Sequence, residues 1–367
     1  MARSSGLVLL LAAWPLAFVN LGTGSRKSWL PRRAKPEKQP HHGNVDGNFY
    51  VDHTCIDCDT CRWMAPQTFG RTARSGPGQS VVHQQPSDTQ EVDRALEAMI
   101  SCPTGSIRTR APVARAKEVL DSFPLAVDVD GLPHVFHLGY HSKKSFGAAS
   151  YFVAGRAGGA LNVMFDSPRF SSKLASLLEE AGGIDFMVLS HKDDVADHIQ
   201  WKKRFPEMRR VMHVADVRGP DAWPYIDMTE IEEQLAGQGP WSLADGLSVI
   251  HTPGHSEGSI TLLAAEGFTG GEGVAFTGDH LALNGRLGRL DGFARYSEDH
   301  DLQADSMLKL ADEDFLWILP GHGRRVHFAS ATERRQRLQK AAEEYREDPK
   351  GEGAPGALFK VLEVAPR

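Results

Sequence analysis

Short apolar runs, bounded by glycine, proline and polar residues, recur along the second half of the chain. Runs of this length and setting are typical of buried β-strands rather than of helices, which need longer periodic segments. The sequence therefore predicts strands at Ala149–Ala154, Leu161–Phe165, Ile184–Leu189, Leu247–Ile250, Gly273–Phe276 and Phe315–Leu319.

Two segments show helical spacing instead. After Ser171 or Ser172, either of which could cap a helix, three leucines follow at three-and-four spacing, and Gly182–Gly183 ends the pattern. Near the C-terminus, Thr332 is the expected cap of a second amphipathic helix. Its apolar stripe consists of Leu338, Ala341, Ala342 and Tyr345.

The loops that follow four of the predicted strands are rich in histidine and aspartate. Sheets usually present functional groups in loops at strand ends. A single histidine or aspartate there is often structural, but four such clusters in succession predict a metal site. The clusters are S-H-K-D-D-V-A-D-H at 190–198, H-T-P-G-H at 251–255, T-G-D-H at 277–280 and P-G-H-G at 320–323.

Composition indicates a globular protein. The 367 residues suffice for two ordinary domains and a tail. Charged residues make up 24% and hydrophobic residues 41% of the chain, and the net charge of −6 comes from an even mix of signs. No basic field favours nucleic acid as a partner.

The N-terminus has the form of a targeting leader. An apolar run from Gly6 to Phe18 is too short to span a membrane and is typical of a signal-peptide core. A basic segment follows, and the first acidic residue is Glu37. This two-part pattern resembles leaders that reach complex plastids through the secretory route, so we expect a plastid protein without membrane attachment after leader removal. A plain secretory signal is the alternative.

The four cysteines have an iron–sulfur spacing. Three lie in Cys55-x2-Cys58-x2-Cys61, and the fourth, Cys102, precedes Pro103. Zinc held by four thiolates and disulfide bonds are the alternatives. Two adjacent two-residue gaps favour one 4Fe–4S cluster, because a single loop can then surround one face of it.

This pattern resembles a bacterial-type ferredoxin reduced to one cluster. In the two-cluster pattern the local run continues with three residues and Cys-Pro, and that cysteine serves the other cluster. Here Ala65-Pro66 stands at that place. The resemblance leaves Cys102 to supply the fourth thiolate of the first cluster.

From about Gly131 to Phe328, the order of the histidine and aspartate motifs resembles the metallo-β-lactamase superfamily. Together with the cysteine segment, the chain resembles a family of fused ferredoxin and metallo-β-lactamase-like proteins of phototrophs. The resemblance implies an α+β protein, in which a small ferredoxin-like domain precedes a four-layer αβ/βα sandwich with two metal ions at the edge of its sheets.

The expected domain boundaries follow from these patterns. We expect the sandwich to fold without the small domain, because the hinge between them has little apolar periodicity. The segments are a leader and linker at 1–45, the ferredoxin-like domain at 46–110, the hinge at 111–124, the sandwich at 125–330 and a C-terminal helix and tail at 331–367.

The first motif departs from the superfamily's His-x-His-x-Asp-His. Asp193 stands at the place of the second histidine, with Asp194 as its rival, and the closing Asp-His pair comes two residues late. The resemblance implies one metal on His191, Asp193 and His255, a second metal on Asp197, His198 and His322, and Asp279 bridging the two.

Three further roles complete the expected site. Asp197 is expected to orient the attacking water as well as to bind metal. His251 is expected to shape its turn, and His280 is a candidate substrate contact.

Two cations a few Å apart acidify a shared water and polarise the group under attack, so no serine or cysteine nucleophile is required. We expect a metal-dependent hydrolase that cleaves ester-like bonds, thioesters included, in a small molecule. A carboxylate in place of imidazole hardens the site, which favours iron or manganese beside zinc.

Two other functions are compatible with these motifs. One is an iron-dependent oxidoreductase, flavodiiron-like or sulfur-oxidising, that the 4Fe–4S cluster and a redox partner protein supply with electrons. The other is a redox-responsive binding protein without catalytic activity.

Overall fold

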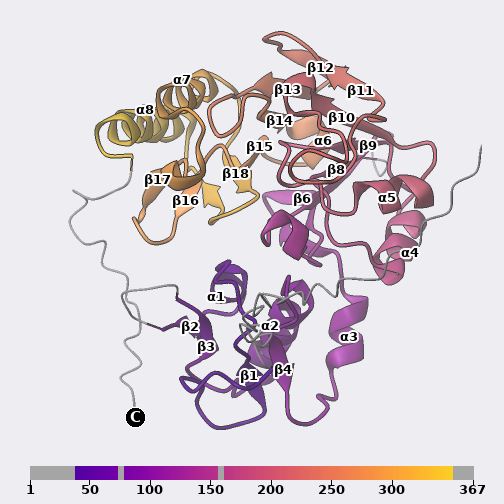
Figure 1. Ribbon diagram of the computed structural model, residues 1–367, viewed down its shortest axis with the longest axis vertical. Coiled ribbons are helices and arrows are strands. Elements are labelled where there is room, and N and C mark those ends of the chain that lie inside the picture. The colour runs from indigo at the N-terminus through magenta and orange to yellow at the C-terminus, as the bar shows by residue number, and fades with distance from the viewer. Residues whose placement is uncertain (1–37, 73–77, 156–160, 350–367) are drawn as a thin grey trace, which may run out of the picture. The chain divides into compact units, whose positions relative to one another are not determined.

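The computed structural model describes residues 38–72, 78–155 and 161–349 (Figure 1). Most of the expected leader, residues 1–37, lies outside the described residues. Within the described ranges, no helix has the length and apolar character needed to cross a membrane.

The N-terminal domain consists of two small antiparallel sheets and two helices. In one sheet β1 pairs with β4, and in the other β2 pairs with β3. Helix α2 begins where the Asp88 side chain accepts a hydrogen bond from the Glu91 amide. The elements are β1 (Phe49–Val51), α1 (Thr60–Met64), β2 (Phe69–Arg71), β3 (Ser80–Val82), α2 (Thr89–Ser101) and β4 (Ile107–Thr109).

This domain begins earlier than residue 46. The Asn44 side-chain oxygen accepts hydrogen bonds from the amides of Val51, at 3.0 Å, and Val82, at 2.9 Å. His41 is buried, and its amide donates to the Val51 carbonyl. The end of the expected linker, up to residue 45, therefore belongs to the domain. The Asn44 side chain accepts hydrogen bonds from strand amides that no neighbouring strand would otherwise satisfy.

The second domain contains a seven-stranded sheet in the order β11-β10-β9-β8-β7-β6-β5. The pairs from β8 to β11 are parallel, and those from β5 to β8 are antiparallel. The strands are β5 (Leu125–Asp128), β6 (Leu132–His137), β7 (Tyr151–Ala154), β8 (Asn162–Phe165), β9 (Phe186–Val188), β10 (Arg209–His213) and β11 (Glu233–Leu235).

A six-stranded sheet faces it, in the order β12-β13-β14-β15-β18-β19. Only β15 and β18 are parallel neighbours, so their carboxyl ends meet at the same edge. The strands are β12 (Trp241–Ala244), β13 (Leu247–His251), β14 (Ile260–Ala264), β15 (Val274–Gly278), β18 (Trp317–Pro320) and β19 (Val326–His327); a separate hairpin joins β16 (Ala282–Asn284) to β17 (Arg289–Asp291).

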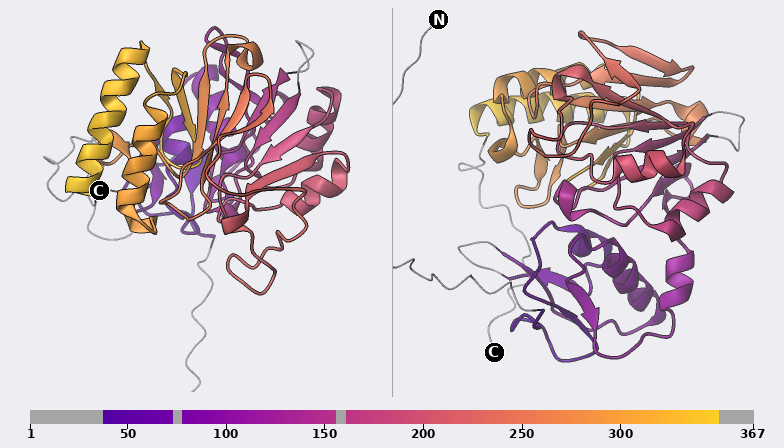
Figure 2. Two further views of the ribbon diagram at one scale, coloured as in Figure 1. Left: turned by 90° about the horizontal axis from the view of Figure 1, so that it is seen from above. Right: turned by 45° about the vertical axis from the view of Figure 1, so that its right-hand side comes forward.

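The two sheets and their helices form four layers (Figure 2). Alternate residues of both sheets fill the core between them, including Phe165 and Phe276, whose ring centroids lie 5.4 Å apart. Helices α4 (Ser172–Glu180) and α5 (His198–Arg204) cover the outer face of the larger sheet, and α7 (His300–Leu310) and α8 (Ala331–Glu347) cover that of the smaller one. The predicted αβ/βα sandwich is confirmed.

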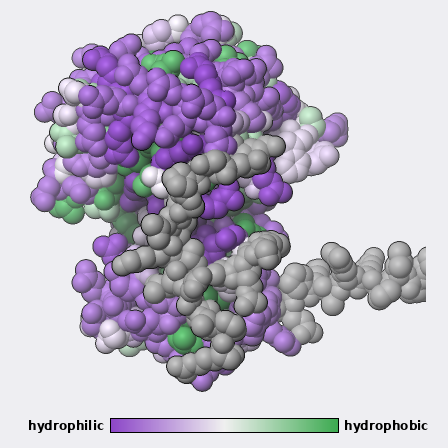
Figure 3. All heavy atoms as spheres, turned by 90° about the vertical axis from the view of Figure 1, so that its left-hand side faces the viewer, coloured by the Kyte–Doolittle hydropathy of each residue, from purple (hydrophilic) through white to green (hydrophobic). Residues whose placement is uncertain are grey.

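The predicted elements occur with small shifts at their ends. All six predicted strands are present, and Ser171 caps α4 by accepting a hydrogen bond from the Leu174 amide. Thr332 was the wrong cap for α8, because Ser330 accepts the bond from Glu333. The polar face of α8 points to solvent, and the side of the molecule that carries α7 and α8 is largely hydrophilic (Figure 3).

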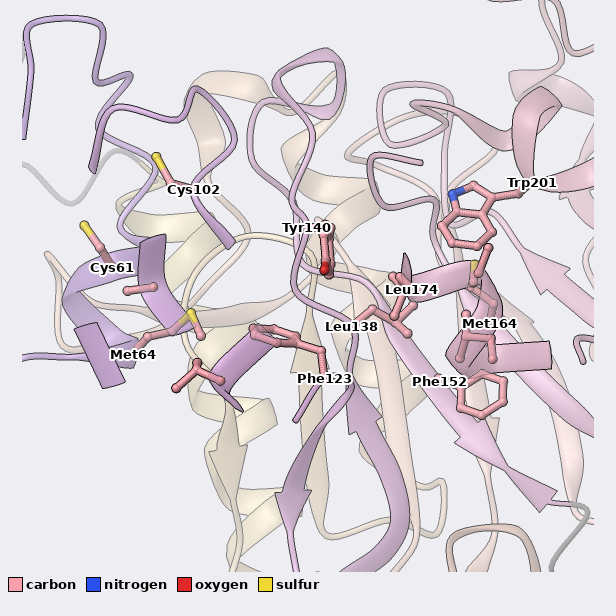
Figure 4. Close-up of a cluster of buried hydrophobic side chains, with 14 of the residues drawn as sticks. Cys61, Met64, Cys102, Phe123, Leu138, Tyr140, Phe152, Met164, Leu174 and Trp201 are labelled. Atoms are coloured by element: carbon pink, nitrogen blue, oxygen red, sulfur yellow. The ribbon is translucent and has the colours of Figure 1, made fainter. Parts of the chain in front are cut away.

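The segment between the domains is not a bare hinge. It forms helix α3 (Ala116–Asp121) and buries Val119 and Phe123. Figure 4 draws the Phe123 ring between Met64 of the N-terminal domain and Leu138 of the sandwich, and all three belong to one continuous core cluster. The expectation of an independently folding sandwich conflicts with this shared core.

We predict that Leu138→Ala destabilises both domains together. Leu138 is fully buried in the shared cluster, and truncating a buried leucine costs about 2–5 kcal/mol of unfolding free energy. In urea, the far-UV circular dichroism and the visible absorbance of the cysteine domain should be lost together at a lower concentration than in the wild type. Val129→Ala, at a position 74% exposed, is the control. Two separate transitions, with the visible absorbance unaffected, would contradict a shared core.

Candidate metal centres

Four strand ends deliver the histidines and aspartates to one edge of the sandwich. His191 follows β9, His255 follows β13, Asp279 follows β15 and His322 follows β18. The parallel pairing of β15 with β18, and a 2.8 Å hydrogen bond from the Gly321 amide to the Gly278 carbonyl, bring the last two loops together. The position of the site thus follows from sheet topology.

The first group of possible ligands is His191, His255 and Asp279. Asp279 Oδ2 lies 4.0 Å from His191 Nε2 and 3.9 Å from His255 Nε2. The two imidazole rings are nearly perpendicular, at 89°, with centroids 4.7 Å apart. Burial lowers the pKa of His255 to about 4, so its imidazole is neutral and can bind a metal.

The second group is Asp194, Asp279 and His322, and it shares Asp279 with the first. His322 Nδ1 lies 2.8 Å from Asp279 Oδ1, and the His322 amide donates to the same oxygen at 3.1 Å. Burial acts to raise the pKa of Asp279, but the charge and hydrogen bond of His322 outweigh it and hold this pKa below the usual range. Asp279 is therefore ionised between the two groups.

The donor atoms fit divalent cations. His191 Nε2 and both carboxylate oxygens of Asp194 are buried without a hydrogen-bond partner, which is costly for polar atoms unless a ligand satisfies them. Burial, and then the charges of Asp279, Asp166 and Asp193, raise the pKa of Asp194. Carboxylates this close together repel one another, and a bound cation would stabilise them. A donor set of imidazoles and carboxylates suits zinc, iron or manganese.

A buried chain of hydrogen bonds orients His191. The Ser190 hydroxyl donates to Asp166 Oδ2 at 3.0 Å and lies 2.9 Å from His191 Nδ1. Because the Ser190 hydroxyl donates its proton to Asp166, the hydroxyl oxygen accepts a hydrogen bond from the Nδ1–H group of His191. The lone pair on His191 Nε2 is then free to bind a metal in the first group. The sequence marked Asp166 only as the end of a strand; its place after β8, on the same edge, was the available signal.

Asp216 joins the loops of two other candidate ligands, and sequence reasoning missed it. This buried carboxylate accepts hydrogen bonds from the Lys192 amide at 3.0 Å, the Ser256 hydroxyl at 2.5 Å and the Gly258 amide at 3.0 Å. It therefore fixes the loop after His191 against the loop after His255. Nothing in the local sequence around Asp216 indicates this role.

Asp197 and His198 lie away from both groups. Asp197 stands at the start of α5, where it pairs with Lys144 at 2.6 Å and accepts from the Phe170 amide at 2.9 Å. His198 Nδ1 lies 3.0 Å from the Arg210 guanidinium, which can only donate, so Nδ1 accepts this bond and Nε2 carries the ring proton instead of a lone pair for a metal. The two extra residues of the motif place this pair on the helix, and Asp194 occupies the second group instead.

The remaining candidates have distinct surroundings. Asp193 Oδ2 lies 4.0 Å from His191 Nε2, at the rim of the first group, while its Oδ1 accepts a hydrogen bond from the Trp223 indole. His251 shapes its turn through a 2.9 Å contact between Nε2 and the Glu257 carbonyl. His280 is as buried as His191, and its carbonyl accepts a hydrogen bond from the Gln303 side chain at 2.8 Å.

The four cysteines line one pocket in the N-terminal domain, and none of them forms a disulfide bond. Backbone amides point at their sulfurs: Ser80 N lies 3.4 Å from Cys55 Sγ, and Ser106 N lies 3.3 Å from Cys102 Sγ. Burial raises the pKa of Cys58 to about 11. Thiolates in such a pocket need a metal or cluster to offset their charge, as an iron–sulfur site provides.

The cysteine loop packs against a loop that leads to the metal groups. A Cβ atom added to Gly147 would lie 2.8 Å from Cys58 Cβ, so the backbone at Gly147 approaches the cysteine as closely as a glycine allows. Two residues further on, the Ala149 amide donates to the Gly321 carbonyl at 2.7 Å. On the other side, the Thr60 hydroxyl lies 3.1 Å from His141 Nδ1.

Comparison with known families agrees with the cysteine pocket. The family described as the 4Fe-4S single cluster domain of Ferredoxin I matches residues 51–109. This segment is ferredoxin-like. The predicted ferredoxin-like domain is thus confirmed, and the matched residues lie within the expected range 46–110. No curated protein sequence gives a significant match to the chain.

Solved structures of the metallo-β-lactamase superfamily are similar to the rest of the chain at low identity, and identities this low do not specify a reaction. A superfamily protein from Sulfolobus tokodaii is 16% identical over 57% of this chain and 86% of its own, with a TM-score of 0.39. A family protein from Thermus thermophilus is 17% identical over 59% and 80%, with a TM-score of 0.42. The metallo-β-lactamase FIM-1 of Pseudomonas aeruginosa, in its mono-zinc form, is 17% identical over 54% and 84%, with a TM-score of 0.41.

We predict that the intact chain, purified without oxygen, is brown and contains acid-labile sulfide with at least an equal amount of iron. Cys102→Ser should bleach the visible band, because one of four thiolate ligands is lost. Iron, sulfide and absorbance should be measured on the intact chain. A colourless protein with zinc on these cysteines would contradict the cluster.

We predict that Gly321→Ala expels metal from the sandwich domain. The added methyl would lie 2.9 Å from Asp194 Oδ2 and 3.0 Å from Asp279 Oδ1, so both carboxylates must move. Metal content should fall while the circular dichroism spectrum is retained. The matched control is Gly267→Ala, whose methyl meets nothing within 4 Å. Equal metal content in the two variants would show that these carboxylates do not bind metal.

Proposed function

We propose that the chain is a metal-dependent hydrolase of ester-like bonds, thioesters included, with an appended iron–sulfur domain. The observation that carries the proposal is the sharing of Asp279 by two groups of buried and half-buried donors. One bridging carboxylate with separate ligands on each side is the donor arrangement of a two-metal site. When bound, two such cations supply a Lewis acid and acidify the attacking water.

The residues of this chain divide that work. His191, His255 and Asp279 would hold one cation, with Asp193 adding a donor from the rim. Asp194 and His322 would hold the other together with Asp279. Zinc, manganese and iron all suit this donor set.

No side-chain nucleophile is needed, and the candidates in this region are engaged elsewhere. The Ser190 hydroxyl is held between Asp166 and His191. The cysteines lie in the ferredoxin-like pocket. Attack by water is therefore the chemistry that best suits the described residues.

We predict that Asp194→Asn and Asp197→Asn behave differently. Asp194→Asn removes a buried carboxylate of the second group, so metal should be lost and hydrolysis should fall by more than about 100-fold, since loss of even outer partners of metal ligands costs 10–100-fold. Asp197→Asn should keep its metal, because Asp197 contacts Lys144 and the Phe170 amide. Metal content and the rate on an ester and thioester panel should be measured on the same samples. If Asp197→Asn loses metal while Asp194→Asn keeps it, the ligand of the second metal is Asp197.

A second candidate is an oxidoreductase whose sandwich domain exchanges electrons with the cluster. The specific observation in its favour is the packing of the Cys58 loop against Gly147, on the segment that is hydrogen-bonded to Gly321. Metal analysis of protein purified without oxygen separates the two candidates. Zinc or manganese in the sandwich supports hydrolysis, and two irons beyond those of the cluster support redox chemistry.

A further inference from the structure

Three large aromatic side chains gather at the surface from two distant parts of the sequence. Phe146 is 47% exposed, Trp223 is 51% exposed and Tyr225 is 67% exposed. The Phe146 and Trp223 rings are stacked at 6.1 Å, and the Trp223 and Tyr225 rings meet edge to face at 6.0 Å. Single exposed aromatic residues are common, but a contiguous aromatic patch marks a binding surface.

This patch borders both metal groups. The Trp223 indole N–H donates to Asp193 Oδ1 at 2.9 Å, and the other oxygen of Asp193 lies 4.0 Å from His191 Nε2. Phe146 belongs to the loop that is fixed to Gly321 by the amide of Ala149. The patch is therefore tied to the first group through Trp223 and to the second through the Phe146 loop.

The backbone holds two of these rings outward at some cost. Phe146 has φ of 49° and Tyr225 has φ of 65°, the left-handed region that bulky side chains rarely adopt. Such conformations persist where the surrounding structure enforces them, and they are common at ligand sites. The Ser145 hydroxyl, which accepts from the Ala196 amide at 3.2 Å, anchors the Phe146 loop to the motif of the first group.

The charges beside the patch favour a neutral ligand group. Lys144 is paired with Asp197, and Lys192 is paired with Glu298, each at 2.6 Å. The Arg218 guanidinium donates to the Val217 carbonyl at 3.0 Å. Lys144 and Lys192 are thus paired with carboxylates, and the surface that Phe146, Trp223 and Tyr225 themselves expose consists of ring faces and edges. Ring faces and edges discriminate in favour of a flat aromatic group through stacked and edge-to-face contacts.

We propose that Phe146, Trp223 and Tyr225 form the substrate-binding wall of the metal site, and that this wall receives an uncharged aryl group carried by the ester or thioester. Trp223 has a second role as a positioning residue, because its indole N–H holds the Asp193 carboxylate toward His191. The substrate class rests on the proposed hydrolase, whereas the aryl-binding wall and the positioning of Asp193 do not.

Binding without turnover tests the wall. The probes are benzamide and hexanamide, which are both neutral and resist hydrolysis, titrated into the metal-loaded full chain by calorimetry. We expect benzamide to bind more tightly than hexanamide. Tyr225→Ala should weaken benzamide binding on the order of tenfold, as loss of an aromatic contact and its buried area implies, and should leave hexanamide binding unchanged. Tyr296→Ala, which removes an aromatic side chain equally exposed at 67%, is the control and should change neither affinity.

Trp223 variants separate its two roles. Trp223→Phe keeps a ring but removes the N–H, so benzamide affinity should remain while zinc affinity of the first group, measured by chelator competition, falls severalfold. Trp223→Ala should lower both the benzamide affinity and the zinc affinity. Unchanged zinc affinity in Trp223→Phe would overturn the positioning role.

Two results would overturn the wall itself. One is benzamide affinity that both Trp223→Ala and Tyr225→Ala leave intact. The other is equal weakening of benzamide and hexanamide, which would mean that the patch binds aliphatic groups. If benzamide binds as expected but no ester or thioester is cleaved, the hydrolase fails and the wall stands. If esters are cleaved without any preference for aryl esters over alkyl esters, the hydrolase stands and the wall fails.

Discussion

The structure depends on how it accommodates buried negative charge at one edge of the two sheets. Asp166, Asp194 and Asp279 are brought together there by strands whose side chains otherwise build the hydrophobic core. Burial and mutual repulsion raise the pKa of Asp194, and burial raises that of Asp166 to about 8, whereas His322 keeps Asp279 ionised. Carboxylates in such a place are stable only when cations, hydrogen bonds or protons balance them. The three have different partners: Asp166 has Ser190, Asp279 has His322, and the Asp194 carboxylate has no hydrogen-bond partner among the described residues.

The sequence predicted the architecture and most of the site because both follow from short-range patterns. An apolar run followed by a turn with histidine or aspartate identifies a strand end, and parallel or neighbouring strands bring such ends together. This reasoning selects four of the candidate metal ligands, which are His191, His255, Asp279 and His322. The cysteine spacing similarly located the pocket expected to hold the iron–sulfur cluster. Asp194 could not be distinguished from Asp193 and Asp197, because the choice depends on where the loop ends and α5 begins.

Other features depend on contacts between residues far apart in the chain. Asp216 acts through loops on either side of it in sequence. Phe146 meets Trp223 although 76 residues separate them in the chain, and no local pattern indicates this contact. The shared core was missed for a similar reason: residues 111–124 have weak periodicity, yet Val119 and Phe123 contribute to a cluster with members in both domains. Periodicity reports one element at a time and cannot reveal which elements share a core.

The close approach of Gly147 to Cys58 has a consequence for how the protein matures. The loop that carries Gly147, which is hydrogen-bonded to Gly321 through the Ala149 amide, rests on Cys58, one of the four candidate cluster ligands. A cluster assembled on the four cysteines would fix the position of Cys58, and with it the loop that carries Gly147.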